Sequence, residues 1–165
     1  MSNTIQFPDP QGSNAKRKIS EDSILEAERG AIFMPHHFLM IPWDTMRRAI
    51  TAVARQLPEN ATIWGVPRGG TLIATMMTYI RPDITLHPAL MESAQDLPTS
   101  VIIVDDIADT GTTLQLMDPQ GNHTCATIFM RASCPIHPTY TGVVIRTKSW
   151  LLFPWEYEPL ELPRT

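Results

Sequence analysis

The sequence predicts an α/β fold in which helices flank a mostly parallel, doubly wound sheet. Short apolar runs, which are typical of buried strands, alternate along the chain with segments whose apolar residues recur at helical spacing. The run Val101–Val104 consists of four β-branched apolar residues, as expected for a strand covered on both faces in the middle of a parallel sheet. A chain of 165 residues is long enough for one domain with a sizeable core.

Composition and charge narrow the class of protein. A hydrophobic fraction of 43% with 18% charged residues is ordinary for a globular chain. The net charge of -4 gives no general attraction to nucleic acid, and no apolar run reaches membrane length. Cys125 and Cys134 form neither a disulfide framework nor a zinc motif. We therefore expect a cytoplasmic protein without a nucleic-acid or membrane partner.

The first half of the chain begins with a polar stretch and continues with alternating elements. Residues 1–30 have little periodicity before Ile24 and are expected to form a flexible N-terminal extension, which could also pack against a partner subunit, so that the domain spans 31–165. Short strands are predicted at Ala31–Met34 and Phe38–Ile41. A helix is predicted from Asp44, as its N-cap, to Pro58, and a second helix from Thr71 to Tyr79 follows a strand at Ala61–Val66.

The second half contains mostly strands. Its predicted strands are Asp83–His87, Val101–Val104, Thr124–Met130, Gly142–Ile145 and Trp150–Phe153. Pro88–Thr99 is a connection of modest length before the central strand. The carboxyl ends of these strands are the places where an open α/β sheet binds its ligands.

The loop after Val104 combines acids with hydroxyls. Asp105 and Asp106 are predicted at the end of the strand, and Asp109 precedes Thr110-Gly111-Thr112-Thr113, which could begin a helix. A helix start with free N–H groups and hydroxyls suits a phosphate. The carboxylates would repel that phosphate unless Mg²⁺ or sugar hydroxyls lay between them. The loop therefore suggests a phosphorylated ribose as ligand, whereas a plain capping turn is the alternative for any single pair of these residues.

A second loop, Pro67–Gly70, follows the strand at 61–66. Its two glycines allow close approach to a ligand, and Arg68 offers a planar fork of donors, a combination that suits phosphate or pyrophosphate. A strand-to-helix turn with a solvated Arg is the alternative. The loop is neither a Walker A motif nor G-x-G-x-x-G.

Asp105-Asp106-Ile107-Ala108-Asp109-Thr110-Gly111-Thr112-Thr113 resembles the signature with which type I phosphoribosyltransferases bind 5-phosphoribosyl-1-pyrophosphate (PRPP), namely two acidic residues, two apolar residues and then Asp-Thr-Gly-x-Thr. The resemblance implies that Thr110, Gly111, Thr112 and Thr113 bind the 5'-phosphate. It also implies that Asp105 and Asp106 hold the ribose hydroxyls directly or through Mg²⁺, and that Asp109 handles a proton at purine N7. A small hood is expected beside the sheet.

Arg68-Gly69-Gly70 resembles the pyrophosphate loop of the 6-oxopurine enzymes, notably the xanthine-guanine type. That likeness implies pyrophosphate binding by Arg68 and Gly69 and a cis peptide bond between Pro67 and Arg68. Arg131 stands where that family has a Lys that donates to the purine O6, so the resemblance implies that Arg131 donates to the base, with a larger, forked group.

The same resemblance assigns three late residues. Trp150 would stack on the base, the backbone of Leu151 would read the base edge, and Glu156 would lie near a second metal position beside Asp105 and Asp106.

The resemblance implies a Mg²⁺-dependent enzyme that transfers phosphoribosyl from PRPP to guanine, xanthine or hypoxanthine in purine salvage, and a homo-oligomer, either dimer or tetramer. The segment Pro88–Thr99 is shorter than the loop that closes over the reacting centre in most of the family. A PRPP or nucleotide sensor without turnover, and a phosphoribosyltransferase for another base, are therefore the alternatives.

Overall fold

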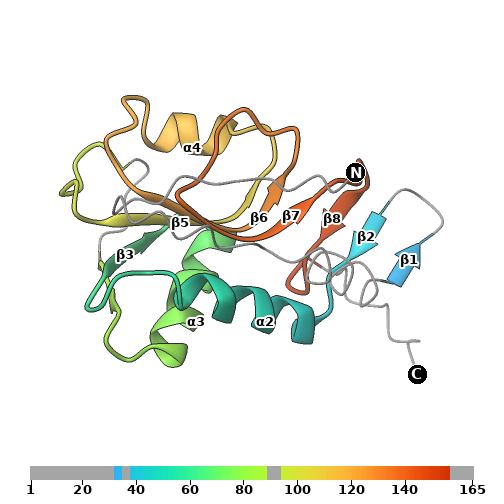
Figure 1. Ribbon diagram of the computed structural model, residues 1–165, viewed down its shortest axis with the longest axis horizontal. Helices are drawn as coiled ribbons and strands as arrows, with labels where there is room; N and C mark the ends of the chain where they lie inside the picture. The colour runs from blue at the N-terminus through green and yellow to red at the C-terminus, as the bar shows by residue number, and fades with distance from the viewer. Residues whose placement is uncertain (1–31, 35–37, 89–93, 157–165) are drawn as a thin grey trace, which may run out of the picture.

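A computed structural model describes residues 32–34, 38–88 and 94–156, and within them two sheets (Figure 1). The larger sheet has the strand order β4-β3-β5-β6-β7, and every neighbouring pair in it is parallel. Its strands are β3 (Thr62–Gly65), β4 (Thr85–Leu86), β5 (Ile102–Ala108), β6 (Cys125–Arg131) and β7 (Tyr140–Ile145). The predicted parallel α/β fold is confirmed.

Helices cover both faces of this sheet (Figure 1). Helices α2 (Trp43–Ala54) and α3 (Gly69–Ile80) lie on one face, and α4 (Thr112–Met117) lies on the other. The core is accordingly divided in two. Along β5, Ile102 and Val104 belong to the core beneath α2 and α3, whereas Ile103 belongs to the core on the α4 side. A strand buried on both faces requires the unbroken apolar run that predicted it.

The order of the strands reverses between β3 and β5. From β3 the chain passes through α3 to β4 at one edge, and it then returns to β5 on the other side of β3. Pairing between β3 and β5 ends at Gly65 and Val104, so the later residues of β5 pair only with β6. Two loops diverge at this point, which is where open α/β sheets bind ligands.

A second, three-stranded sheet lies beside the first and forms the predicted hood (Figure 1). It consists of β1 (Ile32–Met34), β2 (Phe38–Met40) and β8 (Trp150–Leu152). Strand β2 is antiparallel to β1 and parallel to β8, with Phe38 opposite Trp150. This pairing joins the beginning and the end of the described chain.

Several predicted boundaries are wrong. The N-cap of α2 is Pro42, whose backbone is extended (ψ 152°), so that Asp44 lies in the first turn, where Arg47 and Arg48 lower its pKa. Helix α3 begins at Gly69, inside the predicted turn. Strand β5 continues to Ala108, because its partner β6 maintains pairing beyond the point where β3 turns away.

Arg81 ties the ends of α2 and α3 together. Its guanidinium donates to the carbonyls of Ala54 (3.0 Å), Leu57 (2.9 Å) and Pro58 (3.2 Å) and pairs with Asp83. These are carbonyls at and beyond the last turn of α2, which have no donors within the helix.

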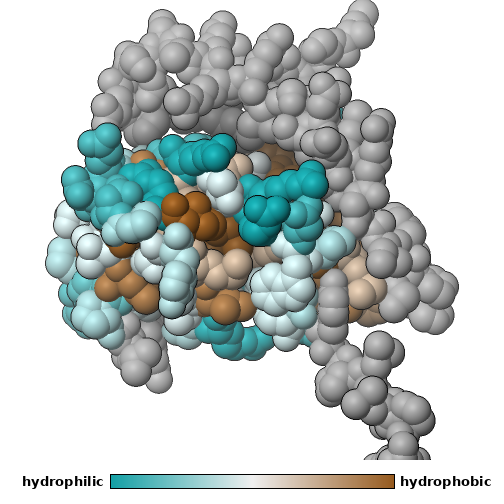
Figure 2. Space-filling model, turned by 90° about the horizontal axis from the view of Figure 1, so that it is seen from below, coloured by the Kyte–Doolittle hydropathy of each residue, from teal (hydrophilic) through white to brown (hydrophobic). Residues whose placement is uncertain are grey.

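The predicted extension at 1–30 lies outside the described residues, as do residues 35–37 and 157–165. Within the described ranges, no helix is long and apolar enough to cross a membrane. Both cysteines are free thiols, as the sequence predicted. Figure 2 views the side that carries α2 and α3, where hydrophobic side chains gather between hydrophilic ones. Exposed hydrophobic residues of these helices are Trp43, Leu72 and Tyr79.

Candidate functional site

A cavity of about 630 Å³ opens where β3 and β5 diverge. This volume is in the range of small-molecule sites, about 300–1,000 Å³. Its walls come from the loop after β3 with the start of α3, from the end of β5 with the loop into α4, and from the chain after β8. The residues that line it are Val66, Pro67, Arg68, Gly69, Leu72, Asp105, Asp106, Ile107, Ala108, Asp109, Thr110, Gly111, Thr112, Thr113, Leu114, Trp155 and Glu156.

Two adjacent carboxyl groups lie at the inner end of this cavity. Asp105 is buried, with 5% of its surface exposed, and its Oδ1 accepts the N–H of Asp106 at 2.9 Å. Burial, with the charge of Asp106, raises the pKa of Asp105 to about 7. Burial also raises the pKa of Asp106, and the negative charge of Glu156 raises it further. The pair therefore disfavours its own full ionisation, and a ligand that supplies positive charge would relieve it.

The glycines of the loop after β3 allow this loop to touch the acidic pair. A Cβ on Gly69 would lie 1.9 Å from Asp106 Oδ2, and one on Gly70 would lie 2.4 Å from the carbonyl oxygen of Val104. Side chains at these positions would push the loop away from β5. The two loops can therefore meet around one ligand only because residues 69 and 70 are glycines.

Arg68 has a strained backbone. Its φ of 78° and ψ of -108° lie in a region that residues other than glycine seldom occupy, at a cost of about 1–3 kcal/mol. The implied cis bond between Pro67 and Arg68 is wrong, because none of the peptide bonds in the described ranges is cis. The unusual φ of Arg68 turns the chain between β3 and α3 with trans peptides. Arg68 is exposed and lines the cavity, and its binding of pyrophosphate stays a prediction.

The loop into α4 is shaped by Gly111. Its φ of 81° is left-handed, and a Cβ there would lie 2.8 Å from the side chain of Ile136. The hydroxyls of Thr110 and Thr112 are 2.8 Å apart, and Thr110 Oγ1 accepts the Thr112 N–H at 3.4 Å. Thr110, Thr112 and Thr113 are exposed around the buried Gly111. The predicted order of hydroxyls and backbone amides at a helix start is therefore present.

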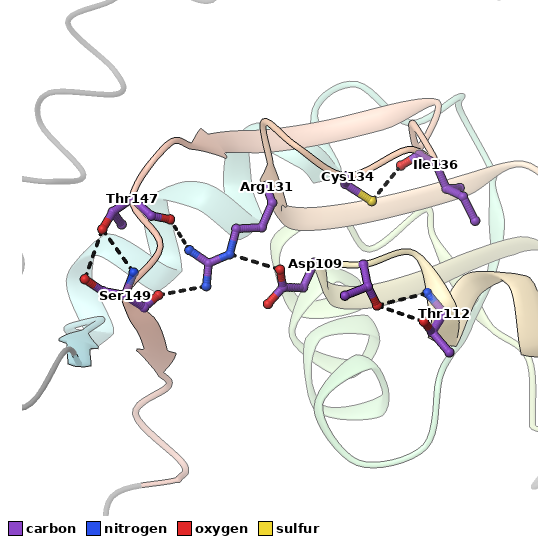
Figure 3. Close-up of polar contacts among 8 residues, drawn as sticks. Asp109, Thr112, Arg131, Cys134, Ile136, Thr147 and Ser149 are labelled. Carbon is purple, nitrogen blue, oxygen red and sulfur yellow. Dashed lines mark hydrogen bonds and ion pairs between the residues drawn. The ribbon is translucent and has the colours of Figure 1, made fainter.

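Asp109 forms an ion pair with Arg131 (Figure 3). The Nε of Arg131 donates to Asp109 Oδ1 at 3.0 Å. The side chain of Asp109 is 45% exposed and lines the cavity, whereas that of Arg131 is 8% exposed. The other two guanidinium nitrogens of Arg131 donate to the carbonyl oxygens of Thr147 and Ser149, the latter at 2.7 Å.

The residues predicted to bind a base are not among those that line the cavity. Trp150 is 61% exposed on the small sheet, Leu151 is buried in that sheet, and Arg131 reaches the cavity only through Asp109. Their binding of a base stays a prediction. All the other predicted site residues line the one cavity.

Sequence reasoning gave no role to Trp155 and Leu72, which also line the cavity. The ring of Trp155 stacks on Phe153 with centroids 5.0 Å apart, and it lies 6.1 Å from Trp43. Its position directly before Glu156 was the available signal. Glu156 turns back so that its Oε2 accepts the N–H of Phe153 at 3.0 Å.

Two of the carboxylates in the cavity have the chemistry that suits Mg²⁺. Among the described residues, no three His, Cys, Asp or Glu side chains form a group that would hold a metal ion by themselves. Mg²⁺, however, is usually held by one or two carboxylates, with water and phosphate oxygens completing six ligands. The buried pair Asp105 and Asp106 matches that requirement, since its unneutralised charge faces a cavity large enough for a phosphorylated ligand.

We predict that ligand-free protein becomes less stable as pH rises from about 4 to 7. The folded pKa of Asp105 is about 7 against an ordinary 3.8, so the folded state retains a proton that the unfolded state has lost. The free energy of unfolding then falls by up to about 1.4 kcal/mol per pH unit from this group. Asp105→Asn should reduce that slope in urea titrations at pH 4.5, 6 and 8, although burial of Asp106 retains part of it. Asp44→Asn, at an exposed carboxyl whose pKa is lowered, should retain it.

A second prediction concerns the backbone of Arg68. Arg68→Gly should be more stable than Arg68→Ala by about 1 kcal/mol, because glycine relieves the strained φ and loses part of that gain to its more flexible unfolded chain. Thermal and urea unfolding of the two variants measure this difference. Asn60 also has a positive φ, of 56°, and lies away from the cavity, so the pair Asn60→Gly and Asn60→Ala provides a positive control. An Arg68→Ala variant as stable as Arg68→Gly would contradict the strain.

No family model matches the sequence. Solved structures do resemble it. A purine phosphoribosyltransferase from Pyrococcus horikoshii is 27% identical, with a TM-score of 0.58 over 75% of this chain and 97% of that one. A xanthine-guanine-hypoxanthine phosphoribosyltransferase from Helicobacter pylori is 18% identical, with a TM-score of 0.53 over 73% and 94%. A Neisseria gonorrhoeae protein with bound ppGpp is 15% identical, with a TM-score of 0.56 over 73% and 89%.

The second and third of these likenesses concern the fold, whereas the first also extends to sequence. Together with the parallel sheet, the hood and the cavity at the strand reversal, they confirm the resemblance that the two loops predicted. The chain has the fold of the type I phosphoribosyltransferases, and the solved structures that it resembles include purine enzymes of that family.

Proposed function

We propose that this protein is a Mg²⁺-dependent phosphoribosyltransferase that transfers the phosphoribosyl group of PRPP to a 6-oxopurine. The products would be a nucleoside 5'-monophosphate and pyrophosphate, as in purine salvage. Guanine, xanthine and hypoxanthine are the candidate bases.

The observation that carries the proposal is the order of groups around one cavity. Arg68 and Gly69 come from the loop after β3 and the start of α3, the acidic pair comes from the end of β5, and the hydroxyls and amides of 110–113 come from the loop into α4; all of them line the cavity. A molecule with pyrophosphate at one end, ribose hydroxyls in the middle and a 5'-phosphate at the other end is complementary to that order. PRPP has this arrangement.

Each group then has a defined task. Thr110–Thr113 bind the 5'-phosphate through hydroxyls and the first N–H groups of α4, which have no acceptors within the helix. Asp105 and Asp106 accept hydrogen bonds from the ribose hydroxyls. Arg68 donates to the pyrophosphate, and Gly69 allows this anion to approach the backbone.

The carboxylates of Asp105 and Asp106 would hold Mg²⁺ together with oxygens of PRPP, and Glu156 would lie near a second metal position. When bound, this ion supplies charge that neutralises the departing pyrophosphate. The raised pKa values of Asp105 and Asp106 imply that protons and the cation compete for the pair.

The reaction is a displacement at the anomeric carbon of the ribose, and its transition state has oxocarbenium character, as in glycoside hydrolysis. The protein holds both ends of PRPP so that this carbon faces the incoming base nitrogen. The Oδ1 of Asp109 already accepts from Arg131, and Oδ2 is available to accept the N–H of the base and to move its proton.

The base would stack on the exposed indole of Trp150 and meet the backbone of Leu151. A purine is favoured over other bases by the sequence likeness to the purine phosphoribosyltransferase from Pyrococcus horikoshii. The preference for a 6-oxopurine has its support in the loop Arg68–Gly70, which resembles that of the xanthine-guanine enzymes.

The proposal is tested by incubating purified protein with PRPP, Mg²⁺ and one base at a time. The bases are guanine, xanthine, hypoxanthine, adenine and orotate, and the nucleotide formed is measured by chromatography. We expect product from at least one 6-oxopurine, and none after chelation of Mg²⁺. PRPP binding by calorimetry runs in parallel. Binding without product from any base would reject the enzyme and support a sensor, and product from orotate alone would reject the purine pocket.

We further predict that Asp109→Asn lowers kcat by about 100-fold or more, which is the usual contribution of a positioned general acid or base. The affinity for PRPP should change less than threefold, because the amide preserves the size of the side chain and an acceptor for Arg131. Asp44→Asn, on the outer surface of α2, is the matched control and should leave both quantities unchanged. Unchanged kcat in Asp109→Asn would remove Asp109 from the proton transfer.

A further inference from the structure

One buried guanidinium joins three segments that are distant in sequence (Figure 3). Arg131 is the last residue of β6 and is 7% exposed. It donates to Asp109 on the loop before α4 at 3.0 Å, and to the carbonyl oxygens of Thr147 and Ser149 between β7 and β8. Three of the five N–H groups that an Arg carries are thus used within the protein.

The segment that receives two of these bonds presents Trp150. It is further fixed by its own side chains, since Thr147 Oγ1 donates to Ser149 Oγ at 3.0 Å and accepts the Ser149 N–H at 3.1 Å. Ser149 directly precedes Trp150, whose indole is exposed and whose strand pairs with β2. Arg131 therefore fixes the backbone of the segment that directly precedes Trp150.

The third bond fixes Asp109. Its Oδ1 is bound by Arg131, so the direction of the remaining oxygen, Oδ2, is set by the same guanidinium. Asp109 is half-exposed and lines the cavity, whereas Arg131 does not. Arg131 thus influences the cavity indirectly, through the carboxylate of Asp109.

We propose that Arg131 is a positioning residue, which aligns the carboxylate of Asp109 with the indole of Trp150 and does not itself read the 6-substituent of the base. The inference rests on the proposed function for its kinetic consequences. It depends on the planar fork of Arg, because a Lys ammonium is a compact donor that cannot span a carboxylate and two carbonyls in that geometry.

Two variants test the role, Arg131→Lys and Arg131→Met. Arg81→Met is the matched control. Like Arg131, Arg81 joins backbone carbonyls to a carboxylate, in its case three carbonyls and Asp83, but it lies at the far ends of α2 and α3. Binding of GMP and AMP by calorimetry reports on the base, binding of PRPP reports on the phosphate half, and turnover reports on Asp109.

For both Arg131 variants we expect kcat to fall at least 30-fold. GMP and AMP should both bind at least tenfold more weakly, with the ratio of their affinities unchanged within threefold, and PRPP affinity should change less than threefold. Arg81→Met should lower the melting temperature and leave these four quantities unchanged. A shift of the GMP to AMP ratio by more than tenfold in Arg131→Met would overturn the proposal and make Arg131 the reader of the base.

Hydrogen exchange gives a readout that does not depend on the proposed function. In Arg131→Met, the amides of 109–112 and of 147–150 should both exchange at least tenfold faster than in the wild type, whereas Arg81→Met should leave both segments protected. Faster exchange in only one segment, or in neither, would overturn the coupling. A wild-type protein without turnover would reject the enzyme, and this exchange result would still decide the role of Arg131.

A double variant completes the test. If Arg131 acts through Asp109, then the loss of kcat in Asp109→Asn with Arg131→Lys should be no greater than threefold beyond the larger single loss. Multiplied losses would mean that the two side chains act independently, which overturns the proposal.

Discussion

The site is built around an unfavourable electrostatic arrangement, in which the carboxyls of Asp105 and Asp106 lie next to each other near the end of β5. Burial raises the pKa of both groups, and the negative charge of Glu156, which also lines the cavity, raises the pKa of Asp106 further. A protein that needed only a stable sheet would place apolar residues here. The pair is understandable as a site prepared for a cation and for sugar hydroxyls, and the fold must hold it without neutralising it with an internal Arg or Lys.

The surrounding backbone has the geometry that this requirement imposes. Gly69 leaves space for the carboxylate of Asp106, and Gly70 leaves space for the carbonyl of Val104, so the two loops approach without side chains between them. The turn that makes this possible places Arg68 at a φ of 78°. The strained backbone of Arg68 and the repulsion between Asp105 and Asp106 thus have one cause, because the fold brings a cationic donor and an acidic pair to the same cavity.

Much of this was predictable because it is encoded locally. The run Val101–Val104, the acids that follow it and the hydroxyls at 110–113 are consecutive, so their order along a strand, a loop and a helix start fixes their neighbourhood. The end of β5 was not predictable in this way, because pairing with β6 carries the strand to Ala108. The strained turn at Arg68 with trans peptides also depends on contacts across the sheet, and a resemblance to relatives gave the wrong bond there.

The same reasoning explains why the surroundings of Arg131 were not foreseen. The family resemblance implies that Arg131 donates to the purine, because it matches residue type and strand position, whereas the acceptors inside the protein are not visible in the sequence. Those acceptors are two backbone carbonyls, which every residue possesses, on a turn 16 to 18 residues further along the chain. An Arg that is 7% exposed must satisfy its charge nearby, and Asp109 supplies the carboxylate. Burial therefore makes Arg131 a partner of Asp109 before it can be a partner of any ligand.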